Sequence, residues 1–206
     1  MKFDGVLFDL DGTLWNATEQ LAVSWQMALE GQPDIDRAPT VSELEKVMGM
    51  TWERLMQTLF PHLTLERAGE LFEHCCEVEN EYLRQHGGTL YDGVEETLRS
   101  LSAQVPLFIV SNCNNGYIEC FLDAHQFRPF FRDWECIGKT GLPKAENIKL
   151  VVERNQLKSP IYFGDTGMDY EAASGAGVPF LHAAYGFGEV DGVPQVPSFR
   201  DLPKFL

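Results

Sequence analysis

The chain has 206 residues, of which 44% are hydrophobic and 23% are charged, a balance that excludes a disordered chain and fits an ordinary globular protein. Acidic residues outnumber basic ones by 31 to 16, and the formal net charge is −15. A field of that sign repels nucleic acid and anionic membranes, so we expect neither as a partner, and a phosphate substrate would need a bound cation and local positive groups at its site.

The N-terminal residues show no targeting pattern. Asp4, Asp9 and Asp11 interrupt the first apolar run too early for a signal peptide. No stretch of the chain approaches the roughly 20 apolar residues that a membrane-spanning helix needs. The five cysteines are odd in number and lack metal-ligand spacing, which indicates reduced thiols. We therefore expect a cytoplasmic protein.

The first expected strand is the apolar run 3–9, and only helical patterns follow it until residue 88. These helices are expected at 17–30, 40–48, 51–59 and 66–86, with glycines and prolines between them. An all-helical stretch directly after the first strand predicts a small cap domain, residues 15–88, inserted into the fold. The alternative is that these helices simply pack on the sheet.

Beyond residue 88, short apolar runs alternate with helix-like segments. Further strands are expected at 106–111, 134–138, 160–164 and 178–183, and helices at 93–104, 114–126, 145–155 and 168–175. This alternation predicts an α/β fold, a doubly wound parallel sheet in a Rossmann-like core made of residues 1–14 and 89–206. Ligands of such sheets bind at the carboxyl ends of the strands, so the polar residues after each apolar run are the candidates for chemistry.

Two carboxylates, Asp9 and Asp11, follow the first strand in the sequence Asp-Leu-Asp-Gly-Thr-Leu. Gly12 lets the chain turn sharply, so both side chains can face the crevice. Two negative charges this close repel each other unless a cation intervenes, and such a pair beside phosphate oxygens suits Mg²⁺. The alternative is an Asx-type turn in which an Asp caps a helix.

Two further clusters could hold a phosphate group. Ser111 and Asn112 close the run 106–111, where a hydroxyl and a helix-opening N–H can bind a phosphate oxygen, although Ser111 could equally be a helix N-cap. Lys144 offers a positive charge for a phosphoryl group. Lys139 competes for that role, and either lysine could be an ordinary surface residue. We prefer Lys144 because it stands at the start of a helix-like segment.

The fourth cluster brings two more carboxylates, Asp165 and Asp169, to the end of the run 160–164. Four carboxylates at neighbouring strand ends would be costly without a metal ion. The first and fourth clusters therefore support each other as a metal site.

These four clusters, in this order, resemble the motifs of the haloacid dehalogenase (HAD) superfamily, in its phosphoglycolate phosphatase-like and β-phosphoglucomutase-like branch. The matching features are Asp-Leu-Asp-Gly-Thr-Leu at 9–14, a strand ending in Ser111, the later Lys144, and Gly-Asp-Thr-Gly-Met-Asp at 164–169. The helical stretch between the first two resembles that superfamily's C1-type cap. The resemblance spans nearly the whole chain and implies an Mg²⁺-dependent phosphoric monoester hydrolase.

The resemblance also implies roles for the acidic residues. Asp9 would be the nucleophile that forms an aspartyl-phosphate, and Asp11 would protonate the leaving oxygen and then deprotonate the attacking water. The Mg²⁺ ion would be bound by Asp9, by the backbone carbonyl of Asp11 and by Asp165, with Asp169 as a further or water-mediated ligand. True dehalogenases resemble the chain at Asp9 but need no acid at the position of Asp11, so this pair indicates phosphoryl chemistry.

The remaining roles concern the phosphoryl group and its leaving group. Ser111 and Lys144 would hold the phosphoryl group, with Asn112 beside it, and Thr13 would contact it or steady the loop. The cap would close over a small phosphorylated metabolite. The chain departs from the branch after the first motif, where Trp15-Asn16-Ala17 replaces the usual Val-Asp-Ser. No particular substrate is therefore implied.

Two other functions remain open from the sequence. A phosphotransferase or sugar-phosphate mutase would use the same aspartyl-phosphate, and a non-catalytic binding module could keep the same scaffold. We expect a monomer or a homodimer. Trp15 and Trp52 are the two tryptophans that we consider for the crevice between cap and core.

Overall fold

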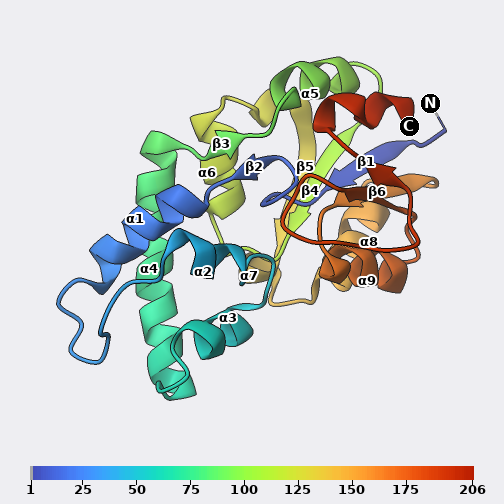
Figure 1. Cartoon of the computed structure of the whole chain (residues 1–206). Helices are drawn as coiled ribbons and strands as arrows, with labels where there is room; N and C mark the ends of the chain where they lie inside the picture. The colour runs from blue at the N-terminus through green and yellow to red at the C-terminus, as the bar shows by residue number, and fades with distance from the viewer. Residues whose placement is uncertain (1) are drawn as a thin grey trace.

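Strand β1 (Gly5–Phe8) lies inside a six-stranded sheet in the computed structural model of the chain, which describes residues 2–206 (Figure 1). The strand order is β5 (Phe131–Cys136), β4 (Leu107–Ser111), β1, β6 (Pro160–Gly164), β7 (Phe180–Ala183) and β8 (Gln195–Val196). Every neighbouring pair is parallel. Successive strands are added on one side of β1 and then on the other, which places the switch point of the sheet at the ends of β4, β1 and β6.

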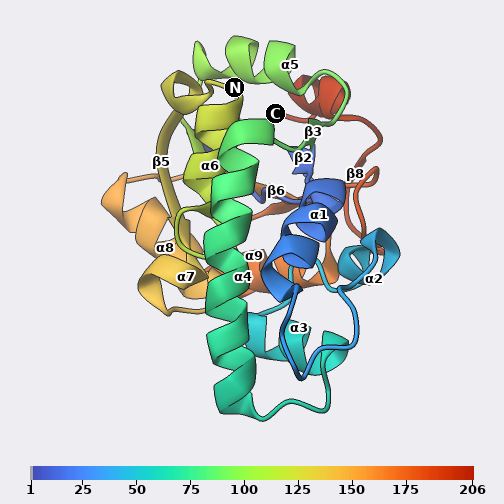
Figure 2. The same ribbon diagram turned by 90° about the vertical axis from the view of Figure 1, so that its left-hand side faces the viewer.

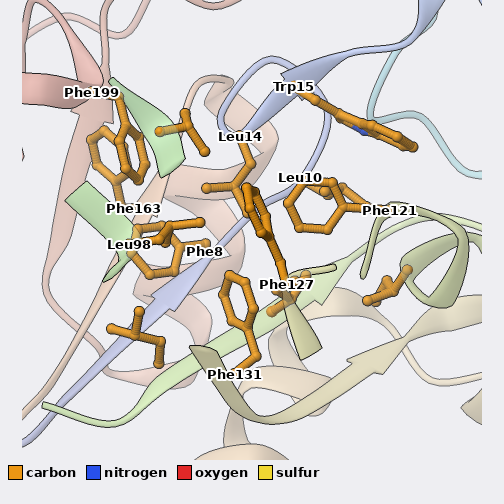
Figure 3. Packing of buried hydrophobic residues seen from close by; sticks show 14 of the residues in the cluster. Phe8, Leu10, Leu14, Trp15, Leu98, Phe121, Phe127, Phe131, Phe163 and Phe199 are labelled. Atoms are coloured by element: carbon orange, nitrogen blue, oxygen red, sulfur yellow. The ribbon is translucent and has the colours of Figure 1, made fainter. Parts of the chain in front are cut away.

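The four inner strands β4, β1, β6 and β7 are buried on both faces, and their apolar side chains alternate between two cores. Phe8 points into the first core, where its ring packs edge to face against Phe163 at 6.1 Å and Phe131 at 6.2 Å between centroids (Figure 3). Leu7 points into the second core. This period-two alternation of apolar residues is typical of a sheet covered by helices on both sides.

The helices complete the two layers. The first core is covered by α5 (Val94–Ser102), α6 (Tyr117–Ala124) and the 3₁₀ segment η2 (Phe199–Lys204). The second is covered by α8 (Lys144–Arg154) and α9 (Gly167–Ala176). Two short elements, η1 (Arg128–Phe130) and α7 (Ile137–Thr140), flank β5. The predicted doubly wound parallel sheet is confirmed.

A helical region follows the first strand, as predicted. It contains α1 (Thr18–Leu29), α2 (Val41–Glu45), α3 (Trp52–Leu59) and α4 (Leu65–His86), which lie to one side of the sheet in Figure 1. Helices α1 and α3 pack against the long α4, and α2 packs against α1 (Figure 2). Helices α1, α3 and α4 share an apolar cluster of their own, with Trp25, Met56 and Leu71 among its buried residues, whereas Leu44 of α2 belongs to the first core.

The chain enters and leaves this region side by side. Strand β2 (Trp15–Asn16) pairs antiparallel with β3 (Thr89–Leu90), with Trp15 opposite Leu90. The pair lies at the limits predicted for the cap, residues 15–88. The division into cap and core domains itself stays a prediction.

The sequence patterns missed three short strands. Both β2 and β3 have only two residues, too few to show a period. The two-residue β8 lies beyond residue 183, where no further strand was expected. None of the helices found within residues 2–206 has the length and apolar character needed to cross a membrane.

Candidate active site

Three of the four predicted clusters meet because they follow neighbouring parallel strands. Asp9 directly follows β1, Ser111 ends β4, and Asp165 directly follows β6. The backbone N–H of Asp9 donates a hydrogen bond of 2.9 Å to the carbonyl of Phe163, which fixes Asp9 beside the end of β6. All three side chains are buried. The sheet therefore gathers residues more than a hundred positions apart into one site.

Lys144, the first residue of α8, reaches into this site from the helix layer that covers the second core. Its Nζ lies 2.5 Å from Oδ1 of Asp9 and 2.5 Å from Oδ1 of Asp169. Burial disfavours the ammonium, but the two carboxylates raise the pKa of Lys144 well above its usual value. Lys144 is therefore a charged group inside the site. Lys139, which competed for this role, pairs with Glu135 at 3.1 Å and is half exposed.

Three carboxylates are placed so that they could hold a metal ion. Oxygens of Asp9, Asp165 and Asp169 lie within 4.8 Å of one another, and all three residues are buried. Buried carboxylate oxygens this close are the hard ligands that Mg²⁺ prefers. Three of the four predicted carboxylates thus form a group that could hold a divalent cation.

Asp165 is held by the loops around it. Its Oδ2 accepts a 2.7 Å hydrogen bond from the backbone N–H of Phe187, and Thr13 Oγ1 lies 3.4 Å from its Oδ1. A Cβ at Gly12, whose φ is +81°, would overlap the Asp165 carboxylate. The glycine is thus required both by its backbone conformation and by the close approach of this carboxylate.

Asp169 is more fully occupied by protein donors than the other two carboxylates. Its Oδ2 accepts hydrogen bonds from the backbone N–H of Thr166 at 3.0 Å and from its hydroxyl at 2.8 Å, which completes a capping box at the start of α9. Its Oδ1 faces Lys144. Asp169 therefore fixes Lys144 and the helix start at the same time.

Burial, together with the neighbouring charges, shifts the pKa values of these carboxyl groups. Burial is the main reason that the pKa of Asp9 is raised to about 6, with Lys144 acting in the opposite direction. Burial, followed by the charges of Asp169 and Asp9, raises the pKa of Asp165 well above its usual value. Carboxylates that raise one another's pKa in this way are stabilised in their charged form by a divalent cation.

Asp11 lies beside Asp9 but outside the three-carboxylate group. Its Oδ1 accepts a 2.8 Å hydrogen bond from the hydroxyl of Tyr117 on α6. Burial, and then the charge of Asp9, raise the pKa of Asp11 to about 8, which favours its proton-carrying form at neutral pH.

A narrow cavity of about 70 Å³ opens over Asp9 and Asp11, between the core and the helical region. Six apolar side chains from α1, α2, α3 and α4 line it: Leu21, Trp25, Leu44, Trp52, Leu55 and Phe72. On the core side, Asn112 Nδ2 donates a 3.0 Å hydrogen bond to the carbonyl of Gly49, so the two parts of the chain contact each other at the cavity.

Two expectations about this area need correction. Helix α6 begins at Tyr117, with Gly116 as its N-cap, so Ser111 is not a cap and no helix opens beside it. Trp15 does not line the cavity; it is fully buried, with its ring 5.1 Å from that of Phe121. Trp52 does line the cavity, as expected.

Two polar residues of the site, Tyr117 and Glu79, were not singled out from the sequence. Tyr117 contacts Asp11, and Glu79 on α4 lines the cavity, where Asn114 donates a 2.8 Å hydrogen bond to its Oε1. A sequence clue existed for Glu79 alone. It replaces an apolar residue in the i, i+4 series Leu71, Cys75, Glu79 and Leu83, all of them buried.

Comparisons with known proteins agree with this geometry. The family described as haloacid dehalogenase-like hydrolase matches residues 6–183. The chain is 30% identical to a phosphoglycolate phosphatase of Pseudomonas savastanoi pv. phaseolicola over 200 residues, which cover 88% of this chain and 70% of that protein. It is 27% identical to a phosphoglycolate phosphatase of Vibrio vulnificus over 212 residues, covering 96% and 90% respectively.

A solved structure with the same fold extends over the whole chain. The crystal structure of a predicted phosphatase from Clostridium acetobutylicum superposes with a TM-score of 0.83 at 24% sequence identity, covering 100% of this chain and 98% of that one. At that identity the likeness supports the fold, including the helical region after β1, and nothing finer.

Proposed function

Because the chain belongs to the haloacid dehalogenase-like hydrolase family, we propose that it is an Mg²⁺-dependent phosphatase that hydrolyses a small phosphate monoester through an aspartyl-phosphate on Asp9. The single observation that carries the proposal is the surrounding of Asp9. Its carboxylate lies at the carboxyl end of β1, where it pairs with Lys144 and lies close to Asp165 and Asp169. It also lines a cavity together with Asp11.

The chemistry divides into two displacements. A carboxylate oxygen of Asp9 attacks phosphorus, and the bond between phosphorus and the ester oxygen breaks as Asp11 donates a proton to the departing alcohol. Asp11 then removes a proton from a water molecule that attacks the same phosphorus, which releases inorganic phosphate and restores the Asp9 carboxylate. The hydrogen bond from Tyr117 holds the Asp11 side chain toward the cavity where both transfers occur.

The metal ion would be held by Asp9, by Asp165 and by the backbone carbonyl of Asp11. When bound, Mg²⁺ offsets the negative charge that builds up between carboxylate and phosphate oxygens. We assign Asp169 to positioning Lys144, because its two oxygens already accept hydrogen bonds from Thr166 and Lys144. The acidic group is buried and compact, which fits a small, hard cation.

The phosphoryl group would be held by Ser111 and Lys144, with Asn112 next to them at the end of β4. Among residues 2–206, Lys144 supplies the one full positive charge paired with Asp9, and a fixed charge at the reacting centre stabilises the transition state without reorganisation. Thr13 has its hydroxyl near Asp165, so we assign it to steadying the loop rather than to phosphate contact.

The test is phosphate release by the purified protein from an aryl phosphate and from a panel of small phosphate monoesters, with Mg²⁺ and with EDTA. We expect release that needs Mg²⁺ and that falls by at least about a thousandfold in Asp9→Asn. Asp191→Asn, the same change on an exposed loop, is the matched control and should keep full activity. Activity retained in Asp9→Asn would contradict the proposal. Phosphate transfer to an added sugar instead of to water would identify a phosphotransferase or mutase.

A further inference from the structure

The side of the cavity that the helical region forms carries an acidic residue. Glu79 on α4 is 5% exposed and lines the cavity together with Asp9 and Asp11. Its Oε2 accepts a 2.7 Å hydrogen bond from the indole N–H of Trp25, and its Oε1 accepts one of 2.8 Å from Asn114. Both donors are neutral, so no ion pair compensates the carboxylate.

The pKa values of Glu79 and Asp11 reflect this lack of a positive partner for Glu79. Burial raises the pKa of Glu79 to about 7, and the charge of Glu79 in turn helps to raise the pKa of Asp11. A buried carboxylate in such a place is stabilised by any cation that enters beside it, and it opposes the entry of another anion.

The cleft beside the cavity is also lined by negatively charged residues. A wider cleft of about 620 Å³ adjoins the cavity and shares Asn112 and Asn114 with it. Helices α3 and α4 contribute three acidic residues to this cleft: Glu53, Glu73 and Glu77. Among residues 2–206, none of the side chains that line the cavity or the cleft is a lysine, an arginine or a histidine.

Asn112 adds an unused acceptor at the boundary of cavity and cleft. Its Nδ2 donates to the carbonyl of Gly49, which fixes the orientation of the amide, because the flipped form would place two oxygens together. Its buried Oδ1 has no hydrogen-bond partner among the described residues. The region around the leaving group thus offers acceptors, a carboxylate and an amide oxygen, to an incoming donor.

From these observations we propose that the leaving alcohol of the substrate carries no negative charge, and that Glu79 selects a terminal ammonium over a terminal carboxylate. This inference rests on the proposed phosphatase function and narrows its substrate class to phosphate esters of amino alcohols. A carboxylate at the far end of the ester would face Glu79 and three further glutamates with no cation to receive it, whereas an ammonium would pair with Glu79 and donate to Asn112.

The size of the cavity favours a short ester. About 70 Å³ is room for roughly five to seven water-sized groups, so a phosphoryl group and the first atoms of the leaving group fill the cavity and the end of the leaving group extends toward the adjoining cleft. Three esters with the same two-carbon chain therefore test the terminal group: phosphoethanolamine ends in an ammonium, 2-hydroxyethyl phosphate in a hydroxyl, and phosphoglycolate in a carboxylate.

We expect kcat/KM for phosphoethanolamine to exceed that for phosphoglycolate by about tenfold or more at low salt, because a like charge beside Glu79 is repelled and an opposite charge is attracted. A value for phosphoglycolate equal to or above that for phosphoethanolamine would overturn the inference. This comparison uses the unmodified protein, so it does not depend on how well any variant folds.

A variant of Glu79 separates its effect from that of the cleft. In Glu79→Gln the ratio of the two kcat/KM values should fall by about tenfold, and a ratio within one preparation is independent of the folded fraction. Glu81→Gln is the matched control, since it makes the same change on the exposed side of α4 and should leave the ratio as it is. An unchanged ratio in Glu79→Gln would exclude Glu79 as the selecting residue.

An aryl phosphate distinguishes failure of this inference from failure of the proposed function. Hydrolysis of the aryl phosphate with the reverse order of the two charged esters would overturn only the substrate class. No hydrolysis of the aryl phosphate or of any of the three esters, with folded protein and Mg²⁺ present, would remove the phosphatase function and this inference together.

Discussion

Lys144 Nζ lies 2.5 Å from Oδ1 of Asp9 and 2.5 Å from Oδ1 of Asp169, so one buried ammonium joins the end of β1 to the first turn of α9. The lysine is itself the first residue of α8. Three elements of the core are thus tied at the carboxyl edge of the sheet by a single charge. Such a contact orients the Asp9 carboxylate as well as compensating its charge.

Replacing Lys144 with Met should therefore abolish most of the activity. We expect kcat for an aryl phosphate to fall by about 10²–10³, because a fixed charge at the reacting phosphoryl group is lost. Lys139→Met removes a half-exposed lysine of the same core and should lower kcat by less than about threefold. Steady-state phosphate release measures both variants. More than a tenth of the original kcat in Lys144→Met would contradict the role given to this lysine.

The contact between Gly12 and Asp165 leads to a second prediction. In Gly12→Ala the new Cβ would overlap the Asp165 carboxylate and displace it from Asp9, so affinity for Mg²⁺ should fall by at least about tenfold. Gly31→Ala is the control, because Gly31 has nearly the same φ, +78° against +81°, and no atom within 4 Å of the added Cβ. Both variants place a non-glycine residue at a positive φ, but only in Gly12→Ala does the new Cβ contact a carboxylate of the proposed metal site.

The increase in melting temperature on adding Mg²⁺ measures this effect, since a ligand that binds the folded state raises its stability. Gly31→Ala should show the same increase as the unmodified protein, and Gly12→Ala should show little or none at the same Mg²⁺ concentration. Equal increases in the two variants would argue against Asp165 as a metal ligand.

A third prediction separates the two carboxylates that follow β6. Asp165→Asn should raise the Mg²⁺ concentration for half-maximal activity by about tenfold or more, because it removes a direct ligand. Asp169→Asn should mainly lower kcat, because it loosens Lys144 and the capping box with Thr166. Titration of activity with Mg²⁺ gives both quantities. The opposite pattern would make Asp169 the direct ligand and Asp165 the positioning residue.

The strand-end residues of the site could be placed from the sequence because parallel strands obey a simple rule. Asp9, Ser111 and Asp165 each follow a buried apolar run, and the carboxyl ends of neighbouring parallel strands meet at one edge. No information about side-chain partners was needed for that conclusion. The helical region was predictable for a similar reason, since residues 17–86 show helical periods and no strand-like run.

The residues that come from helices were harder to place. Glu79 lies on α4 and faces the cavity only because α4 packs beside α1 and α6, a tertiary arrangement that helical periodicity does not specify. Tyr117 contacts Asp11 from the first residue of α6, which starts three residues later than predicted. The two-residue strands β2 and β3 are stabilised by their pairing alone and have no pattern of their own.

The buried Glu79 also makes a prediction for stability. Burial raises its pKa from 4.5 to about 7, so between these values the folded protein holds a proton that the unfolded chain releases. The stabilisation from this protonated carboxyl is therefore complete below about pH 4.5 and is lost as the pH rises through about 7. Gln at this position stays neutral and lacks that dependence.

The measured quantity is the free energy of unfolding of the unmodified protein minus that of Glu79→Gln. At 1.36 kcal/mol per pKa unit, this difference should fall by about 2–3 kcal/mol between pH 5 and pH 8. Urea unfolding at the two pH values measures the difference, and the shifts of Asp9 and Asp165, common to both proteins, largely cancel. The same difference taken with the exposed Glu81→Gln should stay flat. A flat result for Glu79→Gln as well would mean that Glu79 is already compensated by a charge, which would also remove its preference for an ammonium.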